Sequence, residues 1–193
     1  MKIGITGGIG SGKSYVCRRL GERGISVYDC DAAAKRIMRS SPGIRQALTR
    51  LIGSNAYEGG TLNKAAVAAF LLASEDNARA IDAIVHPAVA DDFVSSGSSW
   101  MECAILYESG FDRLVDKVVA VVAPEEVRIA RIMQRDGITR EKAMEWISRQ
   151  MPQDDVARRA GYVIINDGTC DVDRQINKII NKLNLNKTCY RQS

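Results

Sequence analysis

The chain begins with a short apolar stretch that runs directly into a glycine-rich loop, and this junction constrains the fold more than any other feature. Residues 2–14 read Lys-Ile-Gly-Ile-Thr-Gly-Gly-Ile-Gly-Ser-Gly-Lys-Ser, with the spacing G-x-x-x-x-G-K-S over residues 7–14. Glycines have no Cβ, so such a loop can wrap its backbone N–H groups around a chain of phosphates. A merely flexible glycine loop is the alternative. It is disfavoured because alternating Ile3 and Ile5 predict a strand before the loop and an amphipathic pattern predicts a helix after it. The sequence therefore predicts a phosphate-binding Walker A loop.

Two side chains of this loop have a specific chemical task. We expect the ammonium of Lys13 to reach the β- and γ-phosphates of a nucleotide and the hydroxyl of Ser14 to bind Mg²⁺. The helix that starts here adds unpaired N–H groups and the positive end of its dipole. The predicted nucleotide-binding residues are Gly8, Ile9, Gly10, Ser11, Gly12, Lys13, Ser14 and Tyr15.

Composition excludes several other classes of protein. The 193 residues, 46% of them hydrophobic, suffice for a core and fit an α/β domain. No apolar run approaches the length of a membrane span, and the phosphate loop at the N-terminus leaves no place for a removable signal peptide, so we expect a cytoplasmic protein. Five cysteines without a C-x-x-C pair and a single histidine indicate neither a disulfide framework nor a zinc site. The net charge of +4 fits an anionic substrate but is too small to indicate nucleic acid.

A pair of aspartates follows the second predicted strand, residues 25–28. Asp29-Cys30-Asp31 would lie at the carboxyl edge of the sheet, where ligands bind in open α/β folds. Two carboxylates two residues apart on extended chain point to opposite faces, so at most one is expected to face the phosphate loop. Asp31 is the candidate catalytic carboxylate, but it could instead be only the N-cap of a helix over residues 32–39, and both roles can coexist.

The remaining pattern predicts a helical insertion into an α/β core. Further strands are expected at 100–106, 117–122 and 162–165, and the helices that flank the sheet at 13–22 and 171–183, with residues 185–193 frayed. Between the second and third strands the pattern is helical, with a turn at His86-Pro87 and the connections 53–61 and 74–75; the predicted helices are 44–52, 64–72, 77–85 and 87–94. These elements predict a three-layer α/β fold with a parallel five-stranded sheet.

Arginines are concentrated after the fourth strand. Arg128, Arg131 and Arg135 recur along one side of a helix that begins near Pro124, and more arginines follow in a segment bounded by Gly137, Pro152 and Gly161: Arg140, Arg149, Arg158 and Arg159. A solvated basic face is the plain interpretation. The arginine density and the flanking breakers favour a mobile lid over phosphates, because the planar guanidinium binds phosphate oxygens bidentately and keeps its charge.

In this order the motifs are similar to those of the dephospho-coenzyme A kinase family. The likeness spans nearly the whole chain and rests on residues 6–14, Asp29-Cys30-Asp31, His86-Pro87, Arg149-Gln150 and Ile165-Asn166-Asp167-Gly168. It implies a P-loop kinase fold, ATP as donor, the ribose 3′-hydroxyl of dephospho-coenzyme A as acceptor, and Mg²⁺ at Ser14. We also expect a monomer that binds neither nucleic acid nor a membrane.

The resemblance also implies roles for single residues and an internal division of the one domain. Asp31 would be the base near the hydroxyl, with Lys13 and Arg140 also catalytic, and Asn166 would lie near the adenine. Asp31, Lys64, His86 and Glu108 would contact the acceptor. The core would comprise residues 1–36, 97–124 and 160–184, the helical acceptor-binding subdomain 37–96 and the Arg-rich lid 125–159.

The chain departs from the family pattern at a few positions. Tyr15 stands where the family usually has Thr, Cys30 where Ala is usual and Lys64 where Arg is common, and no proline precedes Ile105. Lys64 keeps a charge without the guanidinium fork. Another small-molecule or nucleoside monophosphate kinase is the main alternative. A GTP-dependent switch is disfavoured, because the sequence contains neither D-x-x-G nor an Asn-Lys followed at the right place by Asp.

Overall fold

A five-stranded parallel sheet forms the centre of the computed structural model, which describes residues 1–189 of the chain. Its strand order is β2-β5-β1-β6-β7. β1 pairs in parallel with β5 and β6, and β6 pairs in parallel with β7. The strands are β1 Ile3–Thr6, β2 Tyr28–Asp29, β5 Trp100–Glu102, β6 Lys117–Val122 and β7 Tyr162–Ile165. The predicted α/β fold with a parallel five-stranded sheet is therefore confirmed.

Two strands are shorter than the sequence predicts. β2 lacks residues 25–27 because the N–H of Ile25 donates to the carbonyl of Leu20 at 3.1 Å, which holds this residue against the end of the first helix. β5 ends at Glu102, and the N–H of Cys103 makes its last bond to the sheet, to the carbonyl of Ile5 at 3.0 Å. The apolar pattern of the sequence alone did not predict the start of β2 or the end of β5.

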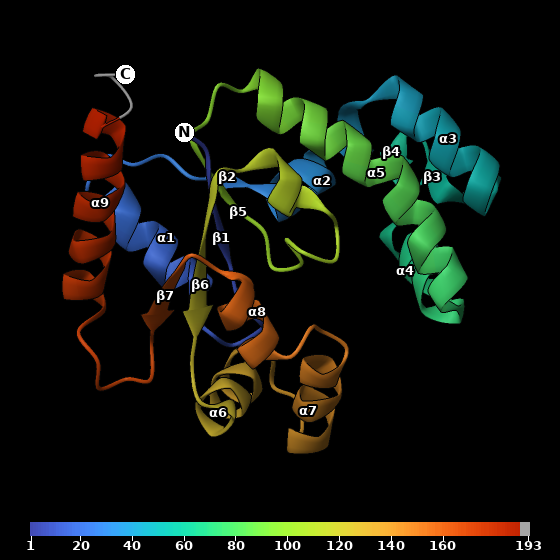
Figure 1. Cartoon of the computed structure of the whole chain (residues 1–193). Coiled ribbons are helices and arrows are strands. Elements are labelled where there is room, and N and C mark those ends of the chain that lie inside the picture. Colours follow the sequence, from blue (N-terminus) through green and yellow to red (C-terminus); the bar gives the residue numbers. More distant parts are fainter. Residues whose placement is uncertain (190–193) are drawn as a thin grey trace. The chain divides into compact units, whose positions relative to one another are not determined.

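The chain divides into two compact units. One comprises Met1–Tyr28 together with the chain from Ser98 onward, and the other comprises Asp29–Gly97. Figure 1 shows the elements of both along the sequence.

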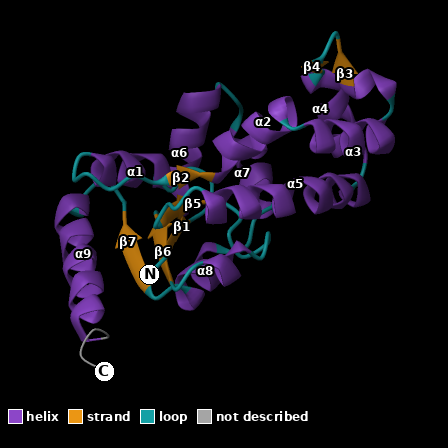
Figure 2. Ribbon diagram, turned by 90° about the horizontal axis from the view of Figure 1, so that it is seen from above, coloured by secondary structure: helices purple, strands orange, loops and turns teal. Residues whose placement is uncertain are grey.

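In the first unit, helices pack on both faces of the sheet. α1 and α9 lie on one side of it and α8 on the other (Figures 1 and 2). The apolar cluster between the sheet and the first pair includes Ile5, Val16, Val121, Ile164 and Ile176. The helices of this unit are α1 Lys13–Gly21, α6 Glu125–Asp136, α7 Arg140–Ser148, α8 Gln153–Arg159 and α9 Val172–Cys189, with a 3-10 turn, η2, at Phe111–Leu114.

The last helix is longer than predicted. α9 continues to Cys189 instead of ending near Leu183, and the fraying expected from residue 185 stays a prediction. Residues 184–189 contain neither glycine nor proline, so nothing in the sequence stops the helix there. The expectation for residues 190–193 lies outside the described part of the chain. Among the helices that are described, none is long and apolar enough to cross a membrane.

The second unit is mostly helical, as predicted, but one of its boundaries differs. The predicted helices 77–85 and 87–94 form the single helix α5, with Pro87 inside it. Proline removes one hydrogen bond from a helix. The apolar face nevertheless continues past it, with buried residues at every fourth position, and the helix packs against α2, α3 and α4, so burial outweighs the lost bond. The buried residues are Ile81, Val85, Val89 and Phe93.

The predicted connection at 53–61 also contains structure. A short hairpin, β3 Tyr57–Glu58 with β4 Thr61–Leu62, turns at Gly59-Gly60, where both φ angles are positive. Adjacent glycines between strands are a hairpin signal that the sequence did carry. The other elements of this unit are α2 Cys30–Ser40, α3 Pro42–Ile52, η1 Ser54–Ala56, α4 Lys64–Ala73 and α5 Glu75–Ser95.

Candidate active site

The phosphate loop connects the end of β1 to the start of α1, as predicted, and it has no room for side chains at its glycines. A Cβ at Gly7 would lie 2.2 Å from the carbonyl oxygen of Val121, and one at Gly12 would lie 2.0 Å from Nδ2 of Asn166. At Gly10, which has φ +79°, a Cβ would lie 2.7 Å from the carbonyl oxygen of Arg128. These glycines are thus required by the packing of the loop against the protein itself.

Side chains from three separate segments hold the backbone of this loop. Arg128 Nε on α6 donates to the carbonyl of Ile9 at 2.9 Å, and Gln150 Oε1, between α7 and α8, accepts from the N–H of Ile9 at 2.7 Å. Asn166, just after β7, donates through Nδ2 to the carbonyl of Ser11 at 2.9 Å. Arg131 Nη1 donates to the carbonyls of Gly10 and Ser11 at 3.3 and 3.4 Å. The loop conformation is therefore fixed by donors and acceptors outside the motif.

Burial strengthens these contacts. Arg128 is only 4% exposed and Asn166 8%. Desolvation lowers the pKa of the Arg128 guanidinium, although arginine stays charged. The hydroxyl of Ser11, also fully buried, makes no hydrogen bond within the described residues.

Lys13 and a carboxylate lie together at the carboxyl edge of the sheet. Lys13 Nζ donates to the carbonyl of Gly7 at 2.8 Å and lies 3.8 Å from Oε1 of Glu102, at the end of β5. Both side chains are largely buried. Sequence reasoning missed Glu102, although an acidic residue inside an otherwise apolar predicted strand was a signal for it. Ser14 and Tyr15 are exposed in the first turn of α1, and the Arg18 guanidinium lies 5.3 Å from the Tyr15 ring centre.

The arginines predicted as a lid have carboxylate or aromatic partners. Arg140 forms a bidentate pair with Glu126, at 2.8 and 2.6 Å, which raises the pKa of the arginine and lowers that of the glutamate. Arg149 pairs with Glu145 and Arg158 with Asp155, and the Arg159 guanidinium lies 3.8 Å from the centre of the Tyr107 ring.

One interpretation of this segment needs correction. The stripe of Arg128, Arg131 and Arg135 is not one exposed face, because Arg128 is buried against the loop while Arg135 is exposed and pairs with Asp136. Arg140 is the first residue of α7.

The predicted acceptor residues lie in different parts of the fold. Glu108 belongs to the unit that contains the sheet, where its Oε1 accepts from the N–H of Met151 at 3.1 Å. Asp31, Lys64 and His86 belong to the helical unit. Lys64 is exposed at the start of α4, and His86 Nε2 on α5 lies 3.3 Å from Oδ1 of Asp82. Their contacts with an acceptor stay predictions.

The aspartate pair is now separated by role in the fold. Asp29 is the N-cap of α2, because its Oδ1 accepts from the N–H of Ala32 at 2.8 Å. Asp31 lies in the first turn and is exposed. The alternative in which Asp31 is the N-cap is therefore wrong, and its carboxylate is not used to start the helix.

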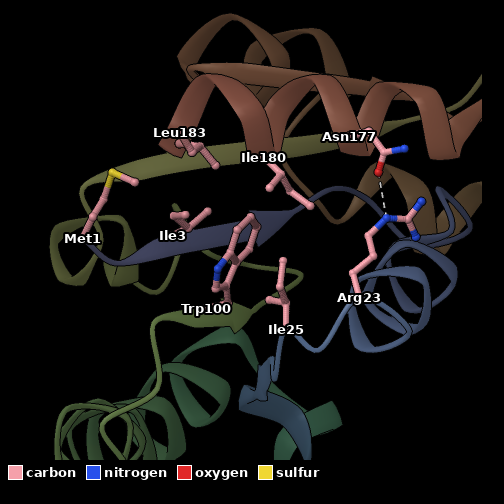
Figure 3. Close-up of a pocket in the computed structure, with 8 residues that line it drawn as sticks. All are labelled: Met1, Ile3, Arg23, Ile25, Trp100, Asn177, Ile180 and Leu183. Atoms are coloured by element: carbon pink, nitrogen blue, oxygen red, sulfur yellow. Dashed lines mark hydrogen bonds between the residues drawn. The ribbon is translucent and has the colours of Figure 1, made fainter. Parts of the chain in front are cut away.

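A cavity of about 440 Å³ lies at the opposite edge of the sheet (Figure 3). Apolar side chains line most of it, including Ile3 and Trp100 at the amino ends of β1 and β5. Its polar end is Arg23, which donates to Asn177, the carbonyl of Arg19 and Asp173. Ligands of open α/β sheets bind outside the carboxyl ends of the strands, so the nucleotide belongs at the loop and not in this cavity.

Comparison with known proteins agrees with this geometry. The family model described as dephospho-CoA kinase matches residues 1–172. A dephospho-CoA kinase of Bacteroides fragilis (strain YCH46) is 42% identical over 187 residues, which cover 93% of this chain and 91% of the relative. One from Porphyromonas gingivalis is 43% identical over 171 residues, 85% of each chain.

Solved structures show the same fold. The crystal structure of TT1252 from Thermus thermophilus superposes with a TM-score of 0.83 at 31% identity, covering 94% of this chain and 96% of that one. A shikimate kinase from Acinetobacter baumannii, at 17% identity and a TM-score of 0.58, covers 96% of this chain and 93% of its own, and shares the fold alone. With the family model matching most of its length, the chain belongs to the dephospho-CoA kinase family.

Proposed function

We propose that this protein transfers the γ-phosphoryl group of ATP to the ribose 3′-hydroxyl of dephospho-coenzyme A, which yields coenzyme A and ADP. The observation that carries the proposal is the phosphate loop, whose backbone is held from three segments and which ends in Lys13 at the start of α1. The acceptor oxygen attacks the γ-phosphorus, the bond to the β–γ bridging oxygen breaks, and ADP keeps that electron pair. The hydroxyl proton passes to a carboxylate or to solvent.

Most of the catalysis is expected to come from charge and position. The Lys13 ammonium lies at the loop, where its proximity to the Gly7 carbonyl and Glu102 fixes its direction before it meets phosphate oxygens. The N-terminus of α1 adds backbone N–H groups that would point toward the same negatively charged phosphates. Arg140 would exchange Glu126 for phosphate as the lid closes.

Mg²⁺ fits the oxygen groups found at this edge. The Ser14 hydroxyl is exposed at the first turn of α1, and the Glu102 carboxylate lies close to Lys13; oxygen donors of this kind are what Mg²⁺ prefers. We propose that Ser14 and the nucleotide phosphates hold the ion. When bound, it would neutralise charge that develops on the transferred group.

Asn166 and the overall organisation complete the proposal. The Asn166 amide fixes the loop carbonyl of Ser11, and we place the adenine beside this residue. We further propose a cytoplasmic monomer that acts on two small molecules and binds neither nucleic acid nor membrane, with residues 125–159 as the lid and 37–96 as the acceptor-binding part.

A coupled assay of ADP release tests the acceptor. Dephospho-coenzyme A should support turnover with ATP far better than shikimate or a nucleoside monophosphate, and mass spectrometry should find one added phosphate on its ribose. Faster turnover with a nucleoside monophosphate would favour the alternative kinase function. A preference for GTP over ATP, with turnover in the absence of any acceptor, would contradict both kinase functions.

Asp31 is proposed as the carboxylate that orients the attacking hydroxyl and accepts its proton late. Because Asp29 already caps α2, the two residues predict different losses. Asp31→Asn should lower turnover by roughly 10²-fold with little change in ATP affinity. Asp29→Asn keeps a side-chain oxygen that can cap α2, so both the free energy of unfolding and turnover should change little.

Turnover, ATP affinity and urea unfolding of both variants, measured across a Mg²⁺ titration, separate these roles. A dead Asp29→Asn enzyme beside an active Asp31→Asn enzyme would reverse the assignment.

A further inference from the structure

Ile9 is held at both of its backbone polar atoms, which belong to the two adjacent peptide planes. Its carbonyl accepts from Arg128 Nε at 2.9 Å, and its N–H donates to Gln150 Oε1 at 2.7 Å. The two side chains come from different places, α6 and the connection that joins α7 to α8. The preceding residue must be glycine for this to occur, since a Cβ at Gly8 would lie 2.4 Å from Arg128 Nη2 and 3.3 Å from Gln150 Oε1.

These two bonds restrict how the loop can rearrange. Rotating either of the two peptide planes that meet at the Ile9 Cα would break one of these bonds, and rotating the Ile9–Gly10 plane would leave the buried Arg128 guanidinium without this acceptor. Gly10, the next residue, has φ +79° and could otherwise follow such a rotation freely. The orientation of Ile9 therefore influences how the loop continues to Gly12 and Lys13, three and four residues further along.

We propose that Gln150 is a positioning residue for ATP binding. It fixes the Ile9 N–H as part of the loop scaffold, so that the N–H groups further along and the Lys13 ammonium are oriented before the phosphates arrive. It also connects the lid segment 125–159, to which it belongs, to the phosphate loop through this bond to Ile9. The inference rests on the proposed use of ATP but not on the identity of the acceptor.

The local packing allows this contact to be removed cleanly. Gln150, Arg128 and Met151 line a hollow of about 460 Å³, so a side chain of similar size can replace the glutamine without overpacking. Gln150→Met keeps length and volume but loses the acceptor oxygen, whereas Gln150→Glu keeps an acceptor oxygen beside Arg128.

The chain offers a matched control at Gln153. Its Oε1 accepts from the N–H of Ala123 at 2.9 Å, after the end of β6, so Gln153→Met removes the same kind of bond outside the phosphate loop.

The experiment measures hydrogen exchange at the Ile9 amide by NMR, ATP binding by calorimetry without any acceptor, and thermal unfolding. Gln150→Met should speed Ile9 exchange at least tenfold and weaken ATP about fivefold to tenfold, while Gln150→Glu should restore most of the amide protection. Gln153→Met should alter neither quantity beyond about twofold.

Unchanged Ile9 exchange in Gln150→Met would overturn the proposal. So would an equal loss of ATP affinity in Gln153→Met, because the effect would then be general destabilisation. Should Gln150→Met fail to fold, Gln150→Glu carries the test: unprotected Ile9 despite a retained acceptor oxygen would contradict the positioning role. If Ile9 exchange and ATP binding respond as expected but the protein does not turn over dephospho-coenzyme A, the result would count against the proposed acceptor and not against the role of Gln150.

Discussion

Arginines in the segment 125–159 fall into two groups that sequence alone does not distinguish. Arg128 is buried and donates to the phosphate loop, and Arg131, which is partly buried, does the same. Arg140, Arg149 and Arg158 are exposed, and each pairs with a carboxylate nearby. The same side chain thus serves as a fixed part of the scaffold in one group and as a replaceable surface charge in the other.

The difference follows from the cost of changing partners. An exposed ion pair contributes only about 0–1 kcal/mol, so a phosphate can replace the carboxylate at little cost. A buried guanidinium cannot form a hydrogen bond to water when it loses its partner. Breaking its bond therefore leaves a desolvated charge and an unpaired carbonyl. We therefore expect the buried group to shape the site before ATP binds and the exposed group to act after it.

The largest effect should come from Arg128→Met. This change removes the charge-assisted bond to the Ile9 carbonyl and leaves that acceptor unpaired, so the free energy of unfolding should fall by about 2–4 kcal/mol. Arg135→Met, on the exposed side of the same helix, should cost under about 1 kcal/mol. Urea unfolding of both variants makes the comparison. Equal losses would mean that burial of Arg128 does not separate it from the exposed group.

Sequence periodicity predicted the regular parts of this fold well. Lys117–Val122 and Tyr162–Ile165 have the predicted bounds. The β-branched run of the first strand is buried on both faces, whereas in the second, at the edge of the sheet, Val163 and Ile165 are exposed. The single helix α5 was not predicted, because a local rule about Pro87 ignores the apolar face that continues on either side of it.

The site shows the same limit. The motif predicted Lys13 and the loop glycines, because a backbone that wraps around phosphate requires that spacing. The motif could not predict that Gln150 contacts Ile9 or that Glu102 lies close to Lys13. Gln150 lies 141 residues from Ile9, and only the tertiary structure brings the two together. The sequence offered Asp31 as the cap of α2, whereas the cap is Asp29, because helix start signals locate a boundary only to within a few residues.

A smaller loss of stability, with a clear loss of activity, is expected for Arg140→Ala. Because Arg140 and Glu126 form an exposed pair, the unfolding free energy should change only slightly. Turnover should fall at least tenfold if the guanidinium reaches the transferred phosphoryl group. Arg158→Ala removes a similarly exposed pair with Asp155 and serves as the control. A stability loss with normal turnover would make Arg140 structural and remove it from the lid.

The smallest effect on the free enzyme is expected for Ser11→Ala. The Ser11 hydroxyl is fully buried and makes no hydrogen bond in the described chain, while the backbone carbonyl of the same residue accepts from Asn166. Removing an unpaired buried hydroxyl costs nothing in lost bonds, so the unfolding free energy should stay the same or rise by up to about 1 kcal/mol. Urea unfolding without nucleotide measures this. The same variant also tests how the loop binds ATP. Unchanged ATP affinity by calorimetry would show that only the backbone of Ser11 contributes to binding, as the scaffold role requires. A fivefold or larger loss of ATP affinity at unchanged stability would mean that the hydroxyl itself turns toward the phosphates, and the loop would then be less fixed than the buried arginine implies.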